Sequence, residues 1–351
     1  MTFARKLILS LILAAILLAA VIYLVGARQT LQAAREVPLP AFLLVGVVFF
    51  GLMACQAAAW SALERPLGHR VPYPSLLAGT IVAMAGNVLT PSTHLGGEPG
   101  KIIYVGRKTG LSYTDLTGTV LLSKYIEAMS FVLFLAFGAG WAVAGHRATL
   151  FSPHHIVLGV AVVALTASAI GLAMLVWLGL RRKWTPLSAV VAGLGRLGFR
   201  QAFFADLHER CLRVELQAAR LFREEGHAVL PAFGWYLLTH VAMFVRPYLF
   251  FHLAWGVRLD LADLGLIFLT SQILLAVQLT PSGVGTLDGG LLGVISLSGI
   301  PISSPQCVAF LLCVRFWDAA VVALGALLAA RAGVGLFRRQ AKETGGGFSE
   351  R

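Results

Sequence analysis

The residues of this chain that could do chemistry gather in one polar motif that occurs twice. Both copies begin Leu-Thr-Pro-Ser and place a carboxylate seven residues after the proline and a glycine two residues after the carboxylate. The first copy, 89–101, contains Glu98, and the second copy, 279–290, contains Asp288. Proline and glycine at this density interrupt a helix. Hydroxyl groups, a carboxylate and the free N–H groups of a following helix are suited to binding a polar or anionic ligand.

Charged residues inside nearby apolar segments add to these motifs, and ionisable residues at membrane depth are functional candidates because they are costly to bury. We therefore predict a substrate-binding site that consists of Thr90, Pro91, Ser92, Gly96, Gly97, Glu98, Lys101, Lys124, Glu127, Arg246, Thr280, Pro281, Ser282, Gly283, Gly285, Asp288, Arg315 and Asp318. We predict no catalytic residue, no metal site and no cofactor, because catalytic motifs and metal-ligand spacings are absent from the sequence.

Two simpler roles for these charges stay open. The pairs Lys124–Glu127 and Arg315–Asp318 are each spaced by three residues on one helix, so they could only neutralise each other. Glu98 and Asp288 could only cap the half helices that follow them.

The composition sets the class of protein. The 351 residues are 58% hydrophobic and only 13% charged, whereas soluble domains are about 25% charged. Several apolar runs exceed the roughly 20 residues that cross a bilayer as a helix. We therefore predict an all-α polytopic membrane protein. The net charge of +12 is better explained by membrane topology than by a nucleic-acid partner.

The helices that position the motifs form two repeats. Short similar segments recur in the same order about 190 residues apart. For example, the sequence of Leu39–Phe42 is repeated at Leu230–Phe233. They indicate a first repeat at 1–150, a second at 151–335 and a polar cytoplasmic tail at 336–351. Spans are predicted at about 7–25, 41–63 and 116–144, and then at 156–180, 229–257 and 306–330. Re-entrant hairpins are predicted at 75–110 and 262–300, because their apolar segments are too short to cross. A signal peptide is the alternative interpretation of 7–25.

Each repeat crosses the membrane three times. Because this number is odd, the second repeat starts on the opposite side and is inverted relative to the first. With a cytoplasmic N-terminus, 21 of the 28 Lys and Arg residues lie inside and four lie outside, as the positive-inside rule requires. The two hairpins then open to opposite sides and meet near the midplane, as in inverted-repeat transporters. Both termini are expected in the cytoplasm of a bacterium, with the chain in the inner membrane. The basic segment 181–227 is interpreted as an amphipathic helix, either on the membrane surface or packed on its own protein.

The two motifs resemble the sequence patterns of a known membrane-protein family. Gly-Gly-Glu-Pro at 96–99 and Pro-Ser-Gly-Val-Gly-Thr-Leu-Asp at 281–288 resemble the flippase-like membrane family. That family includes the membrane half of bacterial lysylphosphatidylglycerol synthase and hopanoid- and glycolipid-associated relatives. The chain departs from the family pattern at Ser282, where the family has glycine, at Asp288, where it has glutamate, and at Lys101, which is one place later than the usual basic residue.

The resemblance implies a lipid translocase that moves a phospholipid, glycolipid or polyprenyl-type lipid between leaflets. The expected partner is a membrane lipid with an anionic or zwitterionic headgroup. No lipid synthesis is expected, because the aminoacyl-transferase domain of the synthases is absent from the sequence. Two alternatives stay open: a secondary transporter of a small anionic solute, and a membrane enzyme or a non-catalytic partner of a lipid-synthesis enzyme.

Overall fold

A computed structural model of the chain describes residues 3–90, 96–151, 156–182, 188–189, 191–193, 201–224, 226–276 and 280–333. Within these ranges the backbone forms helices joined by short turns, and it contains no strand. The prediction of an all-α chain is therefore confirmed. Pro91 and Ser92 of the predicted site, and the predicted tail at 336–351, lie outside the described residues.

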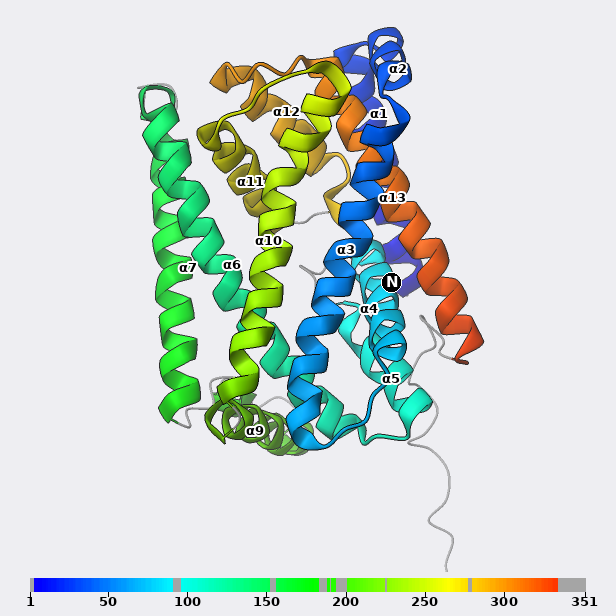
Figure 1. Cartoon of the computed structure of the whole chain (residues 1–351), viewed down its shortest axis with the longest axis vertical. Coiled ribbons are helices and arrows are strands. Elements are labelled where there is room, and N and C mark those ends of the chain that lie inside the picture. Colours follow the sequence, from blue (N-terminus) through cyan, green and yellow to red (C-terminus); the bar gives the residue numbers. More distant parts are fainter. Residues whose placement is uncertain are drawn as a thin grey trace, which may run out of the picture.

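Four long helices form the centre of the bundle and lie alongside one another (Figure 1). They are α3 (Leu39–Glu64), α6 (Tyr113–Leu150), α10 (Gly226–Trp255) and α13 (Ser304–Arg331). Each is long and apolar enough to cross a membrane. They cover the predicted spans at 41–63, 116–144, 229–257 and 306–330, apart from the last two residues of the third. The prediction of a polytopic membrane protein is therefore confirmed.

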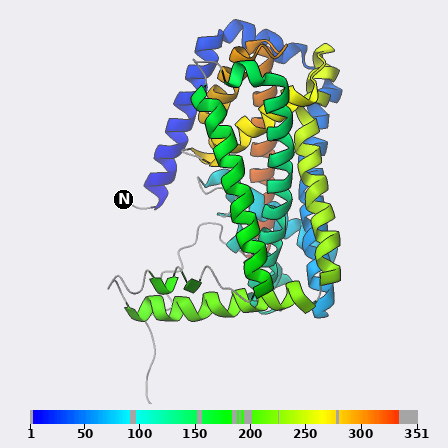
Figure 2. The same ribbon diagram turned by 90° about the vertical axis from the view of Figure 1, so that its left-hand side faces the viewer.

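Three further helices begin the two halves of the chain. Gly26, whose φ is +100°, separates α1 (Phe3–Val25) from α2 (Ala27–Glu36), and the chain bends there by 91°. Figure 2 shows α1 leaning along the upper half of the bundle, with its N-terminal end near mid-height. Helix α7 (Ile156–Arg182) has 27 residues, enough to cross a hydrocarbon core of about 30 Å. The crossings at 7–25 and 156–180 stay predictions.

Shorter helices flank both polar motifs. Helices α4 (Tyr73–Leu89) and α5 (Glu98–Thr109) pack against each other around the first motif. Helices α11 (Leu261–Ala276) and α12 (Thr286–Ser298) do so around the second, with the short 3₁₀ turn η2 (Pro281–Gly283) between them. At 17 and 16 residues, α4 and α11 reach about 25 Å, which is less than the hydrocarbon core. The α4–α5 pair lies in the lower half of Figure 1 and the α11–α12 pair in the upper half.

The two halves of the chain interlock. Helix α10 packs along α3, α13 packs along α4, and α11 packs along α6. Small residues allow close approach at these crossings. Gly265 on α11 faces the backbone of Gly138 on α6, and Gly325 on α13 faces the backbone of α4 at Ile81. Each polar motif is therefore held against a long helix from the other half of the sequence.

Helix α9 (Gln201–Glu224) lies across the lower end of the bundle, transverse to the long helices (Figure 2). It packs against α6, α7 and α10. Glu215 on its inner side is buried and accepts a hydrogen bond from the backbone N–H of Ser188 at 2.9 Å. Helix α9 thus packs on its own protein, which was one of the two interpretations of segment 181–227. Contact of this segment with the membrane surface stays a prediction.

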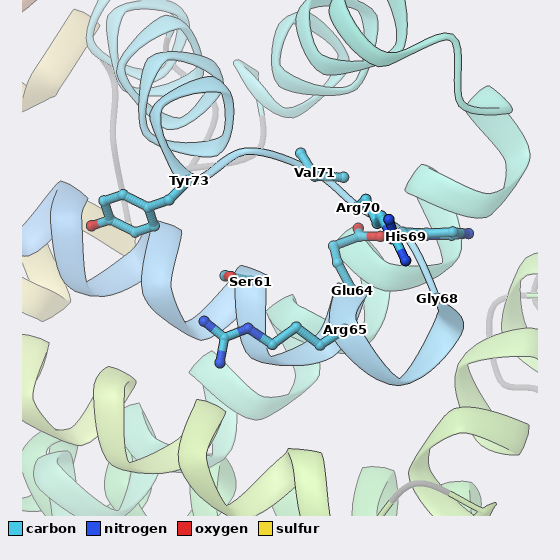
Figure 3. Close-up of a pocket in the computed structure, with 8 residues that line it drawn as sticks. All are labelled: Ser61, Glu64, Arg65, Gly68, His69, Arg70, Val71 and Tyr73. Atoms are coloured by element: carbon cyan, nitrogen blue, oxygen red, sulfur yellow. The ribbon is translucent and has the colours of Figure 1, made fainter.

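A pocket lies where α3 ends at the same lower end of the bundle. The 3₁₀ turn η1 (Arg65–Leu67) follows α3 directly, and Gly68, with φ +72°, turns the chain toward α4. The turn and the connection enclose a pocket of about 370 Å³ beside the last turn of α3 (Figure 3).

Candidate functional site

The first motif is held by a close approach of two backbones. A Cβ atom on Gly97 would lie 1.8 Å from the carbonyl oxygen of Ala83 on α4. The side chain of Asn87, also on α4, accepts a hydrogen bond from the Gly97 N–H at 2.7 Å. Glycine at 97 therefore serves packing, because its φ of −91° is open to any residue. This contact fixes where α5 begins and hence where Glu98 lies.

Replacing Asn87 with Ala should lower the free energy of unfolding by about 1–3 kcal/mol, because the Gly97 N–H would then be buried without an acceptor. The measurement is equilibrium unfolding in mixed lipid–detergent micelles. Thr80→Val is the matched control, since the buried Thr80 hydroxyl donates to the Leu76 carbonyl of its own helix and bonds to no other described residue. Equal losses in the two variants would contradict a special role for Asn87.

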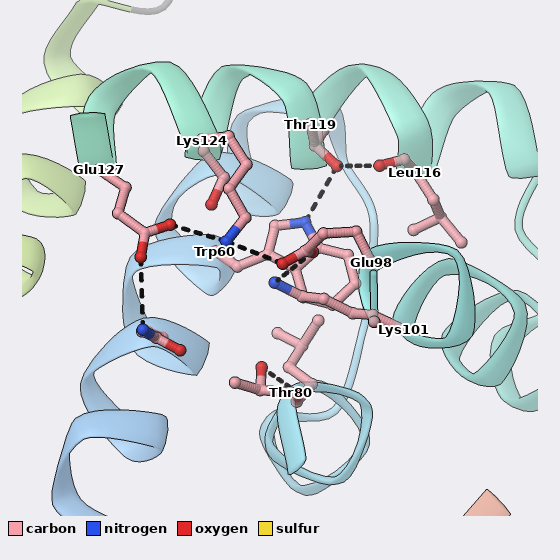
Figure 4. Close-up of polar contacts among 12 residues, drawn as sticks. Trp60, Thr80, Glu98, Lys101, Leu116, Thr119, Lys124 and Glu127 are labelled. Atoms are coloured by element: carbon pink, nitrogen blue, oxygen red, sulfur yellow. Dashed lines mark hydrogen bonds and ion pairs between the residues drawn. The ribbon is translucent and has the colours of Figure 1, made fainter. Parts of the chain in front are cut away.

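Glu98, Lys124 and Glu127 form a cluster that we call the first triad (Figure 4). The Lys124 ammonium lies 2.8 Å from Glu98 Oε1 and 2.9 Å from Glu127 Oε2. Gln56 on α3 donates to the other oxygen of Glu127 at 3.4 Å. The ion pair with Glu98 thus links α6 to the start of α5, and the ion pair with Glu127 lies within α6.

Lys101 lies one helical turn after Glu98 and is 3% exposed. Its ammonium lies 4.3 Å from the centre of the Trp60 ring and 3.9 Å from Glu98 Oε2, too far for a hydrogen bond. Glu98 Oε2 is itself buried and makes no hydrogen bond to a described residue. A cation and a carboxylate oxygen with unused hydrogen-bonding capacity therefore face each other at the first motif.

The second motif folds into a tighter turn. The Thr280 hydroxyl donates to the Val284 carbonyl at 2.7 Å, and Gly283 and Gly285 have φ of +66° and +82°. Ser282 is the one non-glycine residue with positive φ in the described part of the chain, at +52°. Such a conformation favours glycine, which gives a physical reason why glycine in the family pattern suits this position.

Asp288, Arg315 and Asp318 form the second triad. Arg315 Nη2 lies 2.8 Å from Asp288 Oδ1, and Arg315 Nη1 lies 3.1 Å from Asp318 Oδ2. The guanidinium also donates to the backbone carbonyl of Ser282 at 2.9 Å. Asp288 is fully buried and also accepts the Gly285 N–H at 2.7 Å. The arginine therefore connects the second motif to α13.

The two simpler roles considered from the sequence account for part of this geometry. Both pairs spaced by three residues do form, yet each base also binds a carboxylate from a motif. Asp288 caps α12 through Gly285. Glu98 makes no capping bond among the described residues, and the Gly97 N–H at the start of α5 donates to Asn87 instead. The triads are thus links between elements and not only local charge pairs.

Arg246 lies inside α10, in a segment apolar enough to cross the membrane. Its guanidinium lies 5.7 Å from the centre of the Phe310 ring and within electrostatic range of Asp318 and Arg315. Its Nε atom is buried without a hydrogen bond, and the side chain forms no ion pair within the described residues. Among the described residues, Arg246 is therefore a cation in a candidate membrane span that forms no ion pair.

Of the other predicted residues, Thr90 donates its hydroxyl to Gly86 on α4 at 2.8 Å, and Pro281 is buried in η2. Gly96 is exposed at the turn before α5. Sequence reasoning missed Gln56, Trp60 and Asn87, which the structure places at the first motif. Only Asn87 carried a signal, as an amide inside a short apolar run beside the motif.

The fold and the charged clusters define a polytopic helical membrane protein with ionisable groups held inside its bundle. The chain belongs to the family described as lysylphosphatidylglycerol synthase TM region, which matches residues 7–337. This confirms the resemblance inferred from the two motifs.

Two relatives are also found. A UPF0104 membrane protein of Methanothermobacter thermautotrophicus is 24% identical over 329 residues, which cover 90% of this chain and 93% of the relative. A UPF0104 membrane protein of Pyrococcus horikoshii is 21% identical over 141 residues, which cover 40% and 41%. No solved structure matches the chain.

Proposed function

We propose that this protein is a flippase-like lipid translocase whose substrate carries an anionic or zwitterionic headgroup. The observation that carries the proposal is the placement of Lys101 and Arg246 inside the bundle without hydrogen bonds from their charged groups to described residues. Both cations lie inside the bundle, and neither makes a hydrogen bond from its charged group to a described residue. Burying a charge without hydrogen bonds is costly. An anionic headgroup that binds these cations would supply hydrogen-bond acceptors for both.

The packing of the helices supports an inverted repeat. If α3 is equivalent to α10, and α6 to α13, then the packing of α4 on α13 has its counterpart in the packing of α11 on α6. The triads are equivalent under the same pairing of helices. Each triad joins the carboxylate of a motif to a base and a carboxylate on the long helix that follows that motif. On this proposal, the α4–α5 and α11–α12 pairs are re-entrant hairpins that open to opposite sides.

The distribution of charge supports an orientation. The lower end in Figure 1 carries α9, which belongs to the basic segment 181–227. By the positive-inside rule this end faces the cytoplasm. The C-terminal end of α13 then lies toward the cytoplasmic side, and the first hairpin opens to that side. A cytoplasmic N-terminus stays a prediction, since the N-terminal end of α1 lies near mid-height.

The two triads give the proposed mechanism its two gates. A headgroup phosphate binds Lys101 at the first motif while the acyl chains stay in the bilayer. Movement of one repeat against the other exposes Arg246 and the second motif to the opposite leaflet. Each triad holds its hairpin closed through ion pairs to a long helix, and a phosphate that competes for the base would weaken this link.

The test uses the variants Arg246→Gln and Lys101→Gln in proteoliposomes. Each should slow the transfer of fluorescent phosphatidylglycerol between leaflets about tenfold or more, because a hydrogen bond to a charged group contributes about 1.5–3 kcal/mol. Arg246→Gln should not lower the thermal stability, since the arginine makes no ion pair in the described structure. The readout is the fraction of label quenched by external dithionite.

The control variant is Arg213→Gln, which removes an exposed arginine on α9. Normal lipid transfer by both site variants would sink the assignment of Lys101 and Arg246. Uptake of soluble glycerol phosphate by the same vesicles, without lipid transfer, would instead favour the small-solute transporter.

A further inference from the structure

The pocket at the end of α3 is separate from both motifs. It is lined by Ser61, Glu64, Arg65, Gly68, His69, Arg70, Val71 and Tyr73. Figure 3 shows Arg65 and Tyr73 on one side of it and Glu64, His69 and Arg70 on the other. It lies at the end of the bundle that carries α9, where the chain leaves the apolar part of α3 (Figure 1).

The charges of the pocket are unbalanced toward positive. Glu64 is 1% exposed, and both of its oxygens are occupied. Its Oε2 lies 2.6 Å from His69 Nδ1, and its Oε1 accepts the hydroxyl proton of Thr119. Arg65 and Arg70 are exposed, and neither side chain makes an ion pair or hydrogen bond with the described residues. Because Glu64 is already satisfied, the pocket offers two free guanidinium groups and no free carboxylate oxygen.

Buried contacts connect this pocket to the first motif. The Trp60 indole N–H donates to the Thr119 hydroxyl oxygen at 3.0 Å, and that hydroxyl binds Glu64. The ammonium of Lys101 lies against the ring of the same indole, 4.3 Å from its centre (Figure 4). One tryptophan therefore separates the wall of the pocket from the cation that we assign to headgroup binding.

We propose that this pocket is a second anion site, which binds the phosphate group of a phospholipid headgroup or of a soluble phosphate compound. A guanidinium presents paired donors that match phosphate oxygens. The pocket lies where an apolar helix meets a polar turn, the depth at which phospholipid phosphates lie. Binding here does not require transport, so the inference stands or fails separately from the proposed function.

The test compares the full-length variants Arg65→Gln and Arg70→Gln with wild-type protein in detergent micelles. Native mass spectrometry measures retained phosphatidylglycerol, with diacylglycerol as the probe that lacks phosphate. Isothermal titration calorimetry measures inorganic phosphate. Each variant should weaken phosphatidylglycerol binding at one site about tenfold, because each removes a charged hydrogen bond. Arg213→Gln should leave binding unchanged.

Both arginines are exposed, so the variants should fold, and circular dichroism checks this. Sensitivity of phosphatidylglycerol and inorganic phosphate to both variants would support a general phosphate site. Sensitivity of the lipid alone would support a headgroup site. Unchanged lipid and phosphate binding in both variants, or equal retention of diacylglycerol, would overturn the inference. Lys101→Gln should leave binding at this pocket in place, which separates its failure from that of the translocase proposal.

Discussion

Replacing Arg315 with Ala should lower the free energy of unfolding by about 3–5 kcal/mol, the cost of removing one partner from a buried ion pair. Asp288 is fully buried, and Arg315 is the base that neutralises it. Asp318 would lose the same partner. Equilibrium unfolding in mixed lipid–detergent micelles measures the loss, with Arg258→Ala, an exposed arginine, as the control.

A double variant shows whether charge is the cause. Asp288→Asn with Arg315→Gln removes one charge of each sign and keeps an acceptor for the Gly285 N–H. It should recover a large part of the stability lost in Arg315→Ala, because Asp288 would no longer be a buried carboxylate without a base. No recovery would show that the loss of the Asp318 pair or of the contacts of Arg315 with Ser282 dominates instead.

The same change at Lys124 should cost less. The three side chains of the first triad are 12%, 21% and 21% exposed, whereas those of the second are 1%, 12% and 10% exposed. The first triad is less deeply buried within the bundle, so leaving a carboxylate unpaired there should cost less. We therefore expect the first hairpin to be released more readily than the second.

Replacing Gly97 with Ala should be the most damaging change of a single methyl group. The new Cβ would lie 1.8 Å from a backbone oxygen on α4, and a backbone atom cannot rotate away as a side chain can. Overpacking of this kind costs about 1–3 kcal/mol, occasionally more. Glu98 is the next residue, so its ion pair with Lys124 should also be lost, and lipid transfer with it.

The control is Gly234→Ala on α10, where a Cβ would meet nothing within 4 Å. Alanine favours a helix over glycine, so this variant should be as stable as wild type or slightly more stable. Unfolding and lipid transfer are measured on both variants. A Gly97→Ala protein with normal stability and normal transfer would show that α4 and α5 can separate without consequence, which would contradict the packing described above.

The translocase proposal and the pocket inference meet at Trp60. On one side of its ring lies Lys101, and through Thr119 its N–H joins Glu64 in the wall of the pocket. If both tests succeed, two phosphate-binding positions lie on either side of Trp60, one at Lys101 and one in the pocket. If only the pocket test succeeds, the protein binds phosphate at one end of its bundle and its transported substrate must be sought elsewhere.

The sequence by itself determined that this is a helical membrane protein, and it determined where the helices are interrupted. Apolar runs such as 41–63 exceed the length of a bilayer crossing, and this signal is local in the chain. Proline and glycine around Glu98 and Asp288 forbid a continuous helix for equally local reasons. The two motifs were also sufficient to indicate the family, whose model matches residues 7–337.

Only the tertiary structure decided which charges meet. From spacing alone, Lys124 pairs with Glu127. The sequence placed Glu98, 26 residues earlier, in the same predicted site but did not indicate that it is the second partner of Lys124. Lys101 against Trp60 and Gly97 against Ala83 are likewise contacts between different helices. Periodicity along one helix specifies neighbours three and four residues apart. Contacts across a turn depend on how two backbones pack, which the spacing of residues does not specify.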